Sequence, residues 1–153
     1  MNKANIEKLL EKKFSSLERK FAFKKIESEH YEDGLIITYQ NPTTEVLLNY
    51  QIGEFPWIMI ADIKNPKKDR VSLDWLLVEL GEREAPTTDD AFFPEKMAES
   101  QLEAELEKKK EQLLSFGIEM LKGDFALLPK LQERANDYLA ECKKFANRHK
   151  ISA

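Results

Sequence analysis

Few residues of this 153-residue sequence have side chains suited to catalysis. It contains two histidines, His30 near the end of an expected strand and His149 in a charged stretch. Histidine often acts as a general base because it titrates near neutral pH, but both positions indicate solvated side chains. Cys142, the one cysteine, lies on the apolar side of an expected helix, and we interpret it as a buried, inert thiol. We therefore predict no catalytic residue, no intrachain disulfide and a reducing compartment.

Carboxylates are the most numerous reactive groups. Two of them could pair for acid–base chemistry or hold Mg²⁺, and the candidates are Glu79, Glu82, Glu84, Asp89, Asp90 and Glu95. Their spacing matches no calcium-binding loop. The phosphate-binding, zinc-protease and nucleophile-elbow motifs are also absent from the sequence. We interpret these residues as a solvated acidic surface, and we predict no metal and no cofactor.

Charge is distributed unevenly along the chain. Residues 74–103 contain nine acidic and two basic residues, a net charge of −7, whereas residues 1–20 and 130–150 each carry +3. An acidic segment that includes aromatic residues can attract and anchor a basic protein. Ordinary scatter of surface charge is the alternative explanation. The residues that we predict to bind a basic protein partner are Glu82, Glu84, Asp89, Asp90, Phe92 and Phe93.

The overall composition excludes several classes of protein. The length suits one domain over residues 1–153, with 42% hydrophobic and 34% charged residues. A net charge of −4 and a pI near 5.4 argue against binding to nucleic acid. No stretch reaches the ~20 apolar residues of a membrane span. Because residues 1–5 lead into an amphipathic pattern without an apolar run, we expect a cytoplasmic protein.

The first half of the chain predicts a helix followed by an antiparallel meander. Residues 2–20 have apolar positions at helical spacing, and mixed charges on the other face favour docking on a core over binding to a membrane. Alternating and β-branched residues then predict three or four strands, at residues 21–29, 35–40, 46–52 and 55–63. Residues 64–70 form an expected polar loop. Ser72 is an expected N-cap for a short helix over residues 73–80, and residues 82–93 are an expected exposed loop.

The C-terminal part predicts two long helices joined by a tight corner. Residues 94–121 form the first helix, whose mostly polar first half, up to Lys110, is expected to project past the body. Gly123 suits the left-handed conformation that ends a helix, Asp124 can accept free N–H groups, and Pro129 suits a first helical turn. The second helix runs to about residue 148. We predict an α+β fold in which this helical hairpin covers one face of the sheet.

The corner also carries a resemblance. The run Leu113-Leu114-Ser115-Phe116-Gly117-Ile118-Glu119-Met120-Leu121-Lys122-Gly123-Asp124-Phe125, followed by Leu128-Pro129 and Arg134, resembles the C-terminus of a loose set of small bacterial α+β proteins. Some of these look like the immunity partners of polymorphic toxins. The resemblance covers about the last third of the chain and the strand order. It implies a fold and an immunity-like function, and it transfers no catalytic residue. The order of elements is also similar to that of type III secretion chaperones.

Three functions are compatible with these patterns. We favour a non-enzymatic, protein-binding module that engages a basic partner through the 79–95 region. The second is a small-molecule-binding protein or enzyme with a pocket between sheet and hairpin, lined by Tyr39, Tyr50, Trp57 or Tyr138. The third is a secretion-chaperone-like homodimer whose seam is the first half of the long helix, at Met97, Leu102 and Leu106.

Overall fold

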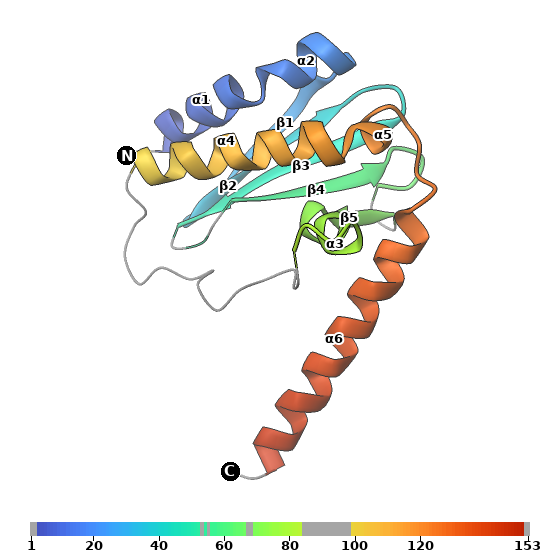
Figure 1. Ribbon diagram of the computed structural model, residues 1–153. Helices are drawn as coiled ribbons and strands as arrows, with labels where there is room; N and C mark the ends of the chain where they lie inside the picture. The colour runs from blue at the N-terminus through green and yellow to red at the C-terminus, as the bar shows by residue number, and fades with distance from the viewer. Residues whose placement is uncertain (1–2, 53, 55, 67–68, 84–98, 152–153) are drawn as a thin grey trace.

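The computed structural model confirms the α+β class and adds one strand to the expected meander (Figure 1). It describes residues 3–52, 54, 56–66, 69–83 and 99–151, with the main chain alone for 148–151. In chain order the elements are α1 (Lys3–Lys13), α2 (Ser15–Phe21), β1 (Lys24–His30), β2 (Gly34–Gln40), β3 (Thr44–Gln51), β4 (Trp57–Asp62), β5 (Arg70–Ser72), α3 (Leu73–Glu79), α4 (Glu99–Phe116), α5 (Ile118–Leu121) and α6 (Leu128–Ile151).

The five strands form one antiparallel sheet in the order β1-β2-β3-β4-β5. Each strand therefore pairs with the strand that precedes it in the chain. The fifth strand was not predicted. β5 is only three residues long, and its pairing with β4 places Val71 opposite Ile60. The expected cap of the next helix is confirmed, because the Ser72 side chain accepts a hydrogen bond from the Asp74 N–H at 3.2 Å.

Alternation along the strands separates a buried face from a less covered one. The buried face contains side chains that are at most 4% exposed, namely Leu35, Ile37, Tyr39, Val46, Leu48, Tyr50, Ile58, Ile60 and Val71. Their neighbours Ile36, Trp57 and Met59 point to the opposite face and are half-buried. The core of the protein thus lies on one side of the sheet.

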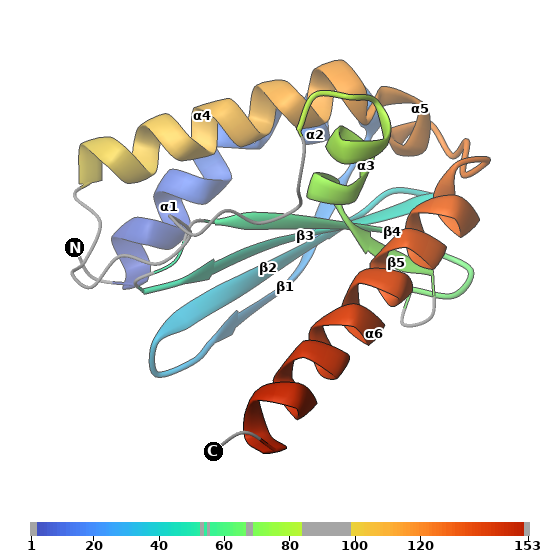
Figure 2. The same cartoon turned by 60° about the horizontal axis from the view of Figure 1, so that its bottom comes forward.

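A layer of helices covers the buried face, with α1 beside α4 (Figures 1 and 2). Ile6 and Leu10 of α1 and Leu102 and Leu106 of α4 are all buried. The expectation that the first half of the long helix projects past the body is therefore wrong. Its thin apolar stripe packs on the chain's own core, which also removes Leu102 and Leu106 from the predicted dimer seam. Met97 lies outside the described residues.

The corner between the last helices has the predicted chemistry. α4 ends at Phe116, and α5 follows after Gly117. Gly123 has a positive φ of 97°, and the Asp124 carboxylate accepts the Ala126 N–H at 3.0 Å. Thr44 donates its hydroxyl hydrogen to the Met120 carbonyl at 2.8 Å, which fixes the corner to the start of β3. The prediction that one helix ends and the next begins at this corner is thus confirmed.

The direction of α6 after this corner differs from the expected hairpin. The main contacts of α6 are with α3 and β5, and the helix diverges from α4 (Figure 1). Leu128 and Leu131 are buried at its base, and Tyr138 packs edge-on against Trp75 with ring centroids 5.5 Å apart. Every residue from 136 to 147 is exposed. The second half of α6 therefore projects from the body.

Candidate functional site

Only the beginning of the predicted partner-binding segment falls within the described residues. Glu82 follows the end of α3, where its N–H donates to the Leu77 carbonyl at 2.8 Å, and its side chain is exposed. The other five predicted residues lie outside the described ranges: Glu84, Asp89, Asp90, Phe92 and Phe93. The structure thus places one predicted site residue at the surface, at the point where the acidic segment leaves α3.

Two cations of the body neutralise Asp74, the first acidic residue of the −7 segment. Arg83 reaches one carboxylate oxygen of Asp74 at 2.7 Å, and the ammonium of Lys109 reaches the same oxygen at 3.2 Å. Lys109 is only 7% exposed, so this group links α3 to the middle of α4. As a result, the Arg83 guanidinium is held against α3 by Asp74.

Glu79 belongs to the body as well. Its carboxylate pairs with Lys130 at 2.5 Å and with the Nε of Arg134 at 2.7 Å, both in the first turns of α6. The hydrogen bond from Lys130 and the charge of Arg134 hold the pKa of Glu79 below its usual value. Because these contacts fasten α6 to α3, Glu79 is engaged within the chain. The candidate surface therefore begins at Glu82.

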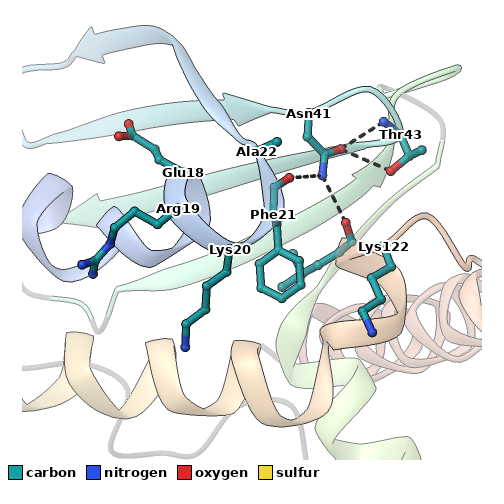
Figure 3. A pocket seen from close by; sticks show the side chains of 9 residues that line it. Glu18, Arg19, Lys20, Phe21, Ala22, Asn41, Thr43 and Lys122 are labelled. Carbon is teal, nitrogen blue, oxygen red and sulfur yellow. Dashed lines mark hydrogen bonds between the residues drawn. The ribbon is translucent and has the colours of Figure 1, made fainter.

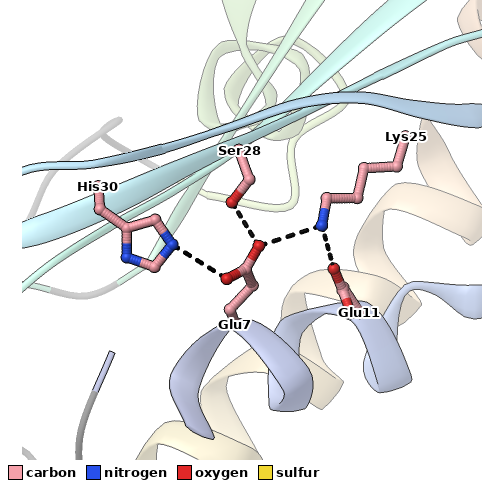
Figure 4. A network of polar contacts seen from close by, with 5 residues as sticks. All are labelled: Glu7, Glu11, Lys25, Ser28 and His30. Carbon is pink, nitrogen blue, oxygen red and sulfur yellow. Dashed lines mark hydrogen bonds and ion pairs between the residues drawn. The ribbon is translucent and has the colours of Figure 1, made fainter. Parts of the chain in front are cut away.

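A second group of polar side chains joins α1 to the edge strand β1 (Figure 4). One oxygen of Glu7 accepts hydrogen bonds from Ser28 at 2.5 Å and from Lys25 at 3.0 Å, and the other oxygen lies 3.0 Å from the Nε2 of His30. Lys25 also pairs with Glu11. The bond from Ser28, helped by Lys25 and His30, lowers the pKa of Glu7 to about 2.

A serine, a histidine and a glutamate close together could suggest nucleophilic catalysis, but the hydrogen bonds between them do not. A catalytic triad needs the serine hydroxyl to bond to the histidine, so that the imidazole can take its proton. Here Ser28 and His30 each bond to Glu7 instead. The arrangement fits an electrostatic clamp between a helix and a strand. No sequence signal pointed to it, because it depends on the register that aligns β1 with α1.

A surface hollow of about 450 Å³ lies where the ends of α2 and α5 meet the β2–β3 turn (Figure 3). Asn41 joins the three parts. Its Nδ2 donates to the carbonyls of Phe21 at 3.0 Å and Leu121 at 3.1 Å, while its Oδ1 accepts the N–H of Thr43 at 3.0 Å.

Two lysines line the hollow, Lys20 in the last turn of α2 and Lys122 at the C-cap of α5. Cations at these positions complement the negative ends of helix dipoles. The backbone carbonyls at these helix ends would repel an anion bound in the hollow. The arrangement therefore fits a structural joint.

The aromatic residues of the predicted small-molecule pocket do not come together. Tyr39 and Tyr50 are buried on the helix-covered face of the sheet. Trp57 precedes the inward-facing Ile58 and so points to the opposite face. Tyr138 lies on α6 beside Trp75. These four residues therefore do not line one pocket between the sheet and the helical hairpin.

The exposed half of α6 carries an apolar surface that the sequence prediction had assigned to the core. Leu139 is 56% exposed and Phe145 is 64% exposed. Cys142 between them is exposed too, so the prediction of a buried thiol is wrong. The amphipathic pattern was visible in the sequence, but nothing in it showed that the chain itself buries only the first turns. For His149 the structure describes the main chain alone.

Comparison with protein-family models, with curated proteins and with solved structures finds no match. Within the described ranges, no helix combines the length and the apolar content that crossing a membrane requires. In the same ranges, no three histidine, cysteine, aspartate or glutamate side chains are grouped so as to hold a metal ion. The candidate site therefore rests on the geometry of this chain alone.

Proposed function

We propose that this chain is a non-enzymatic, protein-binding module that captures a basic protein through the acidic segment beginning at Glu82. The ion pair between Arg83 and Asp74 is the observation that carries the proposal. Arg83 is one of only two basic residues among residues 74–103. Because its guanidinium pairs with Asp74, this cation is engaged within the body at the point where the acidic segment begins.

The pairing of the other acidic residues supports the same interpretation. Asp74 and Glu79 are neutralised by cations of the body, and Glu103 pairs with Lys13 at 3.2 Å. Of the acidic residues of this segment that the structure describes, these three are engaged within the chain, whereas Glu82 is exposed at the end of α3. A concentrated negative field speeds encounter with a basic protein and selects its orientation.

An immunity-like role is the form of this function that the C-terminal resemblance implies. In that role the chain would act in the cytoplasm and neutralise a basic toxin by covering part of its surface. Such a role needs affinity and no chemistry of its own. It agrees with the structural use of Glu7, Ser28 and His30 described above.

Charge reversal combined with affinity capture tests the proposal. The variant Glu82→Lys/Asp89→Lys/Asp90→Lys is compared with Glu32→Lys/Glu111→Lys/Glu119→Lys, which changes the net charge equally at exposed positions elsewhere. Tagged protein is incubated with lysate at low salt and at ~0.5 M salt, where attraction between exposed charges is largely screened. We expect one stoichiometric basic partner that is lost at high salt and with the first variant, and retained by the second. Equal capture by both variants would remove the acidic segment from the function.

A further inference from the structure

The strand β1 forms an open edge of the sheet (Figures 1 and 2). Six of its seven residues are exposed, and Ser28 is half-buried. The opposite edge, β5, is only three residues long and contacts both α3 and α6. An edge strand whose N–H and C=O groups face solvent can pair with a strand of another chain. β1 is therefore the edge at which a further strand can be added.

The register of β1 shows which of its backbone groups point outward. The Tyr31 N–H donates to the Gly34 carbonyl at 2.8 Å, so these two residues form a hydrogen-bonded pair at the β1–β2 turn. Because such pairs alternate with non-bonded pairs along an antiparallel ladder, the N–H and C=O groups of Ser28 and His30 point away from β2. In the described part of the chain no backbone group bonds to them. The edge thus offers two donors and two acceptors.

Alternation gives the two faces of β1 different charges. The side chains of Lys25, Ser28 and His30 point to the helix-covered face, where the Glu7 carboxylate binds all three (Figure 4). The other lysine of the strand, Lys24, lies on the far side of the bulge between residues 25 and 27. The cations of β1 are therefore held by α1 or separated from the open part of the edge.

Glu27 and Glu29 point to the opposite face, along the open part of the edge. Both are exposed, and within the described residues no cation pairs with either carboxylate. The Tyr31 hydroxyl donates to Glu29 at 2.5 Å. The hydrogen bond with Glu29 and the negative charge of Glu29 raise the pKa of Glu27. A lysine or arginine placed beside the two carboxylates would relieve this repulsion.

The two carboxylates select which strand the edge can accept. In an added antiparallel strand, the residues opposite Glu27 and Glu29 would form the non-hydrogen-bonded pairs, in which side chains lie closest. Basic residues at these positions are attracted, whereas like charges directly opposite each other are destabilising. A second copy that paired antiparallel around Ser28 would place Glu27 opposite Glu29. Repulsion therefore disfavours self-association through this edge and favours a basic strand.

We propose that the open edge of β1 binds an extended segment of another protein, in which basic residues alternate with uncharged ones, as an added antiparallel strand. Main-chain hydrogen bonds to Ser28 and His30 supply affinity, and the carboxylates of Glu27 and Glu29 select the basic side chains. This surface is separate from the acidic segment at Glu82, and the inference does not depend on that segment.

A synthetic heptapeptide with blocked ends, in which threonine alternates with lysine, tests the charge selection by calorimetric titration at about 0.1 M salt. We expect a dissociation constant on the order of 100 µM. Glu27→Gln/Glu29→Gln should weaken binding about 10-fold. The matched control, Glu111→Gln/Glu119→Gln, removes two exposed carboxylates from the helix layer and should leave binding unchanged. No binding at about 1 mM peptide, or equal weakening by both variants, would overturn the proposal.

Amide hydrogen exchange tests whether the peptide joins the sheet. Bonds to an added strand should slow exchange of the Ser28 and His30 N–H groups about 10-fold at saturation, whereas those of Glu27 and Glu29 already face β2 and should change little. A peptide N-methylated at its threonines keeps its charge and loses the paired donors, so it should bind about 10-fold more weakly. Unchanged affinity of the methylated peptide, or unchanged exchange at Ser28 and His30, would reduce the interaction to charge attraction and contradict the proposal.

Discussion

Gly123 lies directly against the side chain of Thr43. A Cβ added to Gly123 would lie 2.9 Å from the Cβ of Thr43 and 3.0 Å from its Oγ1. The positive φ of Gly123 turns the chain into α6, and the contact holds this turn against the β2–β3 connection. The corner thus needs glycine for its conformation and also for the space beside Thr43.

Substitution of Gly123 by alanine should destabilise the protein by about 2–3 kcal/mol, because strain at positive φ and the clash with Thr43 act together. Gly81→Ala is the matched control. Gly81 has a similar φ of 77°, but no atom lies within 4 Å of an added Cβ, so only about 1 kcal/mol should be lost. Urea denaturation measures both values. Equal losses would show that the contact with Thr43 has no energetic role.

Asn41→Asp should weaken the joint between α2, α5 and the β2–β3 turn. The substitution removes both donations to the carbonyls of Phe21 and Leu121. It also places a negative charge beside the C-terminal ends of two helices. We expect a loss of about 2–3 kcal/mol in the free energy of unfolding. Asn136→Asp, at an exposed position of α6, should change it by less than about 0.5 kcal/mol. A similar small change for both variants would argue against the joint.

The clamp at Glu7 should make stability depend on pH in the acid range. The folded-state pKa of Glu7 is about 2, below its ordinary 4.5, so the unfolded chain takes up a proton first as the pH falls. The contribution of Glu7 is complete above its ordinary pKa and is lost between that value and about 2. Glu7→Gln should therefore cost about 1–2 kcal/mol at neutral pH and clearly less near pH 3.

Chemical denaturation of the native chain and Glu7→Gln at the two pH values measures this difference. Glu32→Gln, at an exposed turn position, serves as the control for removing a carboxylate. If the gap between the native chain and Glu7→Gln stayed the same at both pH values, the clamp would not depend on the Glu7 charge.

Two leucines of α6 should respond differently to truncation. Leu131 is fully buried, and Leu131→Ala should cost about 3 kcal/mol because it removes packing and leaves a cavity. Leu139→Ala removes the same atoms from an exposed position and should change the free energy of unfolding by less than about 0.5 kcal/mol. Urea denaturation measures both values. A large loss for Leu139→Ala in dilute solution would mean that the second half of α6 docks on its own body.

The parts of the fold that depend on local sequence were predictable. Alternation and β-branched residues identified the strands now seen as β2 and β3, and Ser72 identified the start of α3. The strand β5 was missed because three residues after a polar loop have no periodicity of their own. Its pairing with β4, with Val71 beside Ile60, is a tertiary effect.

The arrangement of the helices was not predictable from amphipathicity. An apolar stripe shows that one side of a helix is suited to burial. It does not show which part of the protein will cover that side. Leu102 and Leu106 looked too sparse for docking, yet α1 completes their environment. The fuller stripe of α6 looked like core, yet the chain buries only its first turns. At the candidate site, the exposed position of Glu82 followed from the absence of periodicity over residues 82–93. The inward turn of Arg83 toward Asp74 did not, since it depends on how α3 ends.

During synthesis on a ribosome, the sheet and the helix layer of this chain should form at different times. Each strand pairs with the strand made just before it, so the sheet can grow as the polypeptide emerges. The helix layer cannot do so, because Lys13 finds its partner Glu107 only 94 residues later. Contacts that are distant in sequence form slowly. The apolar side of α1 therefore stays without its partner α4 until α4 has been translated. During that interval chaperones have most access to the nascent chain.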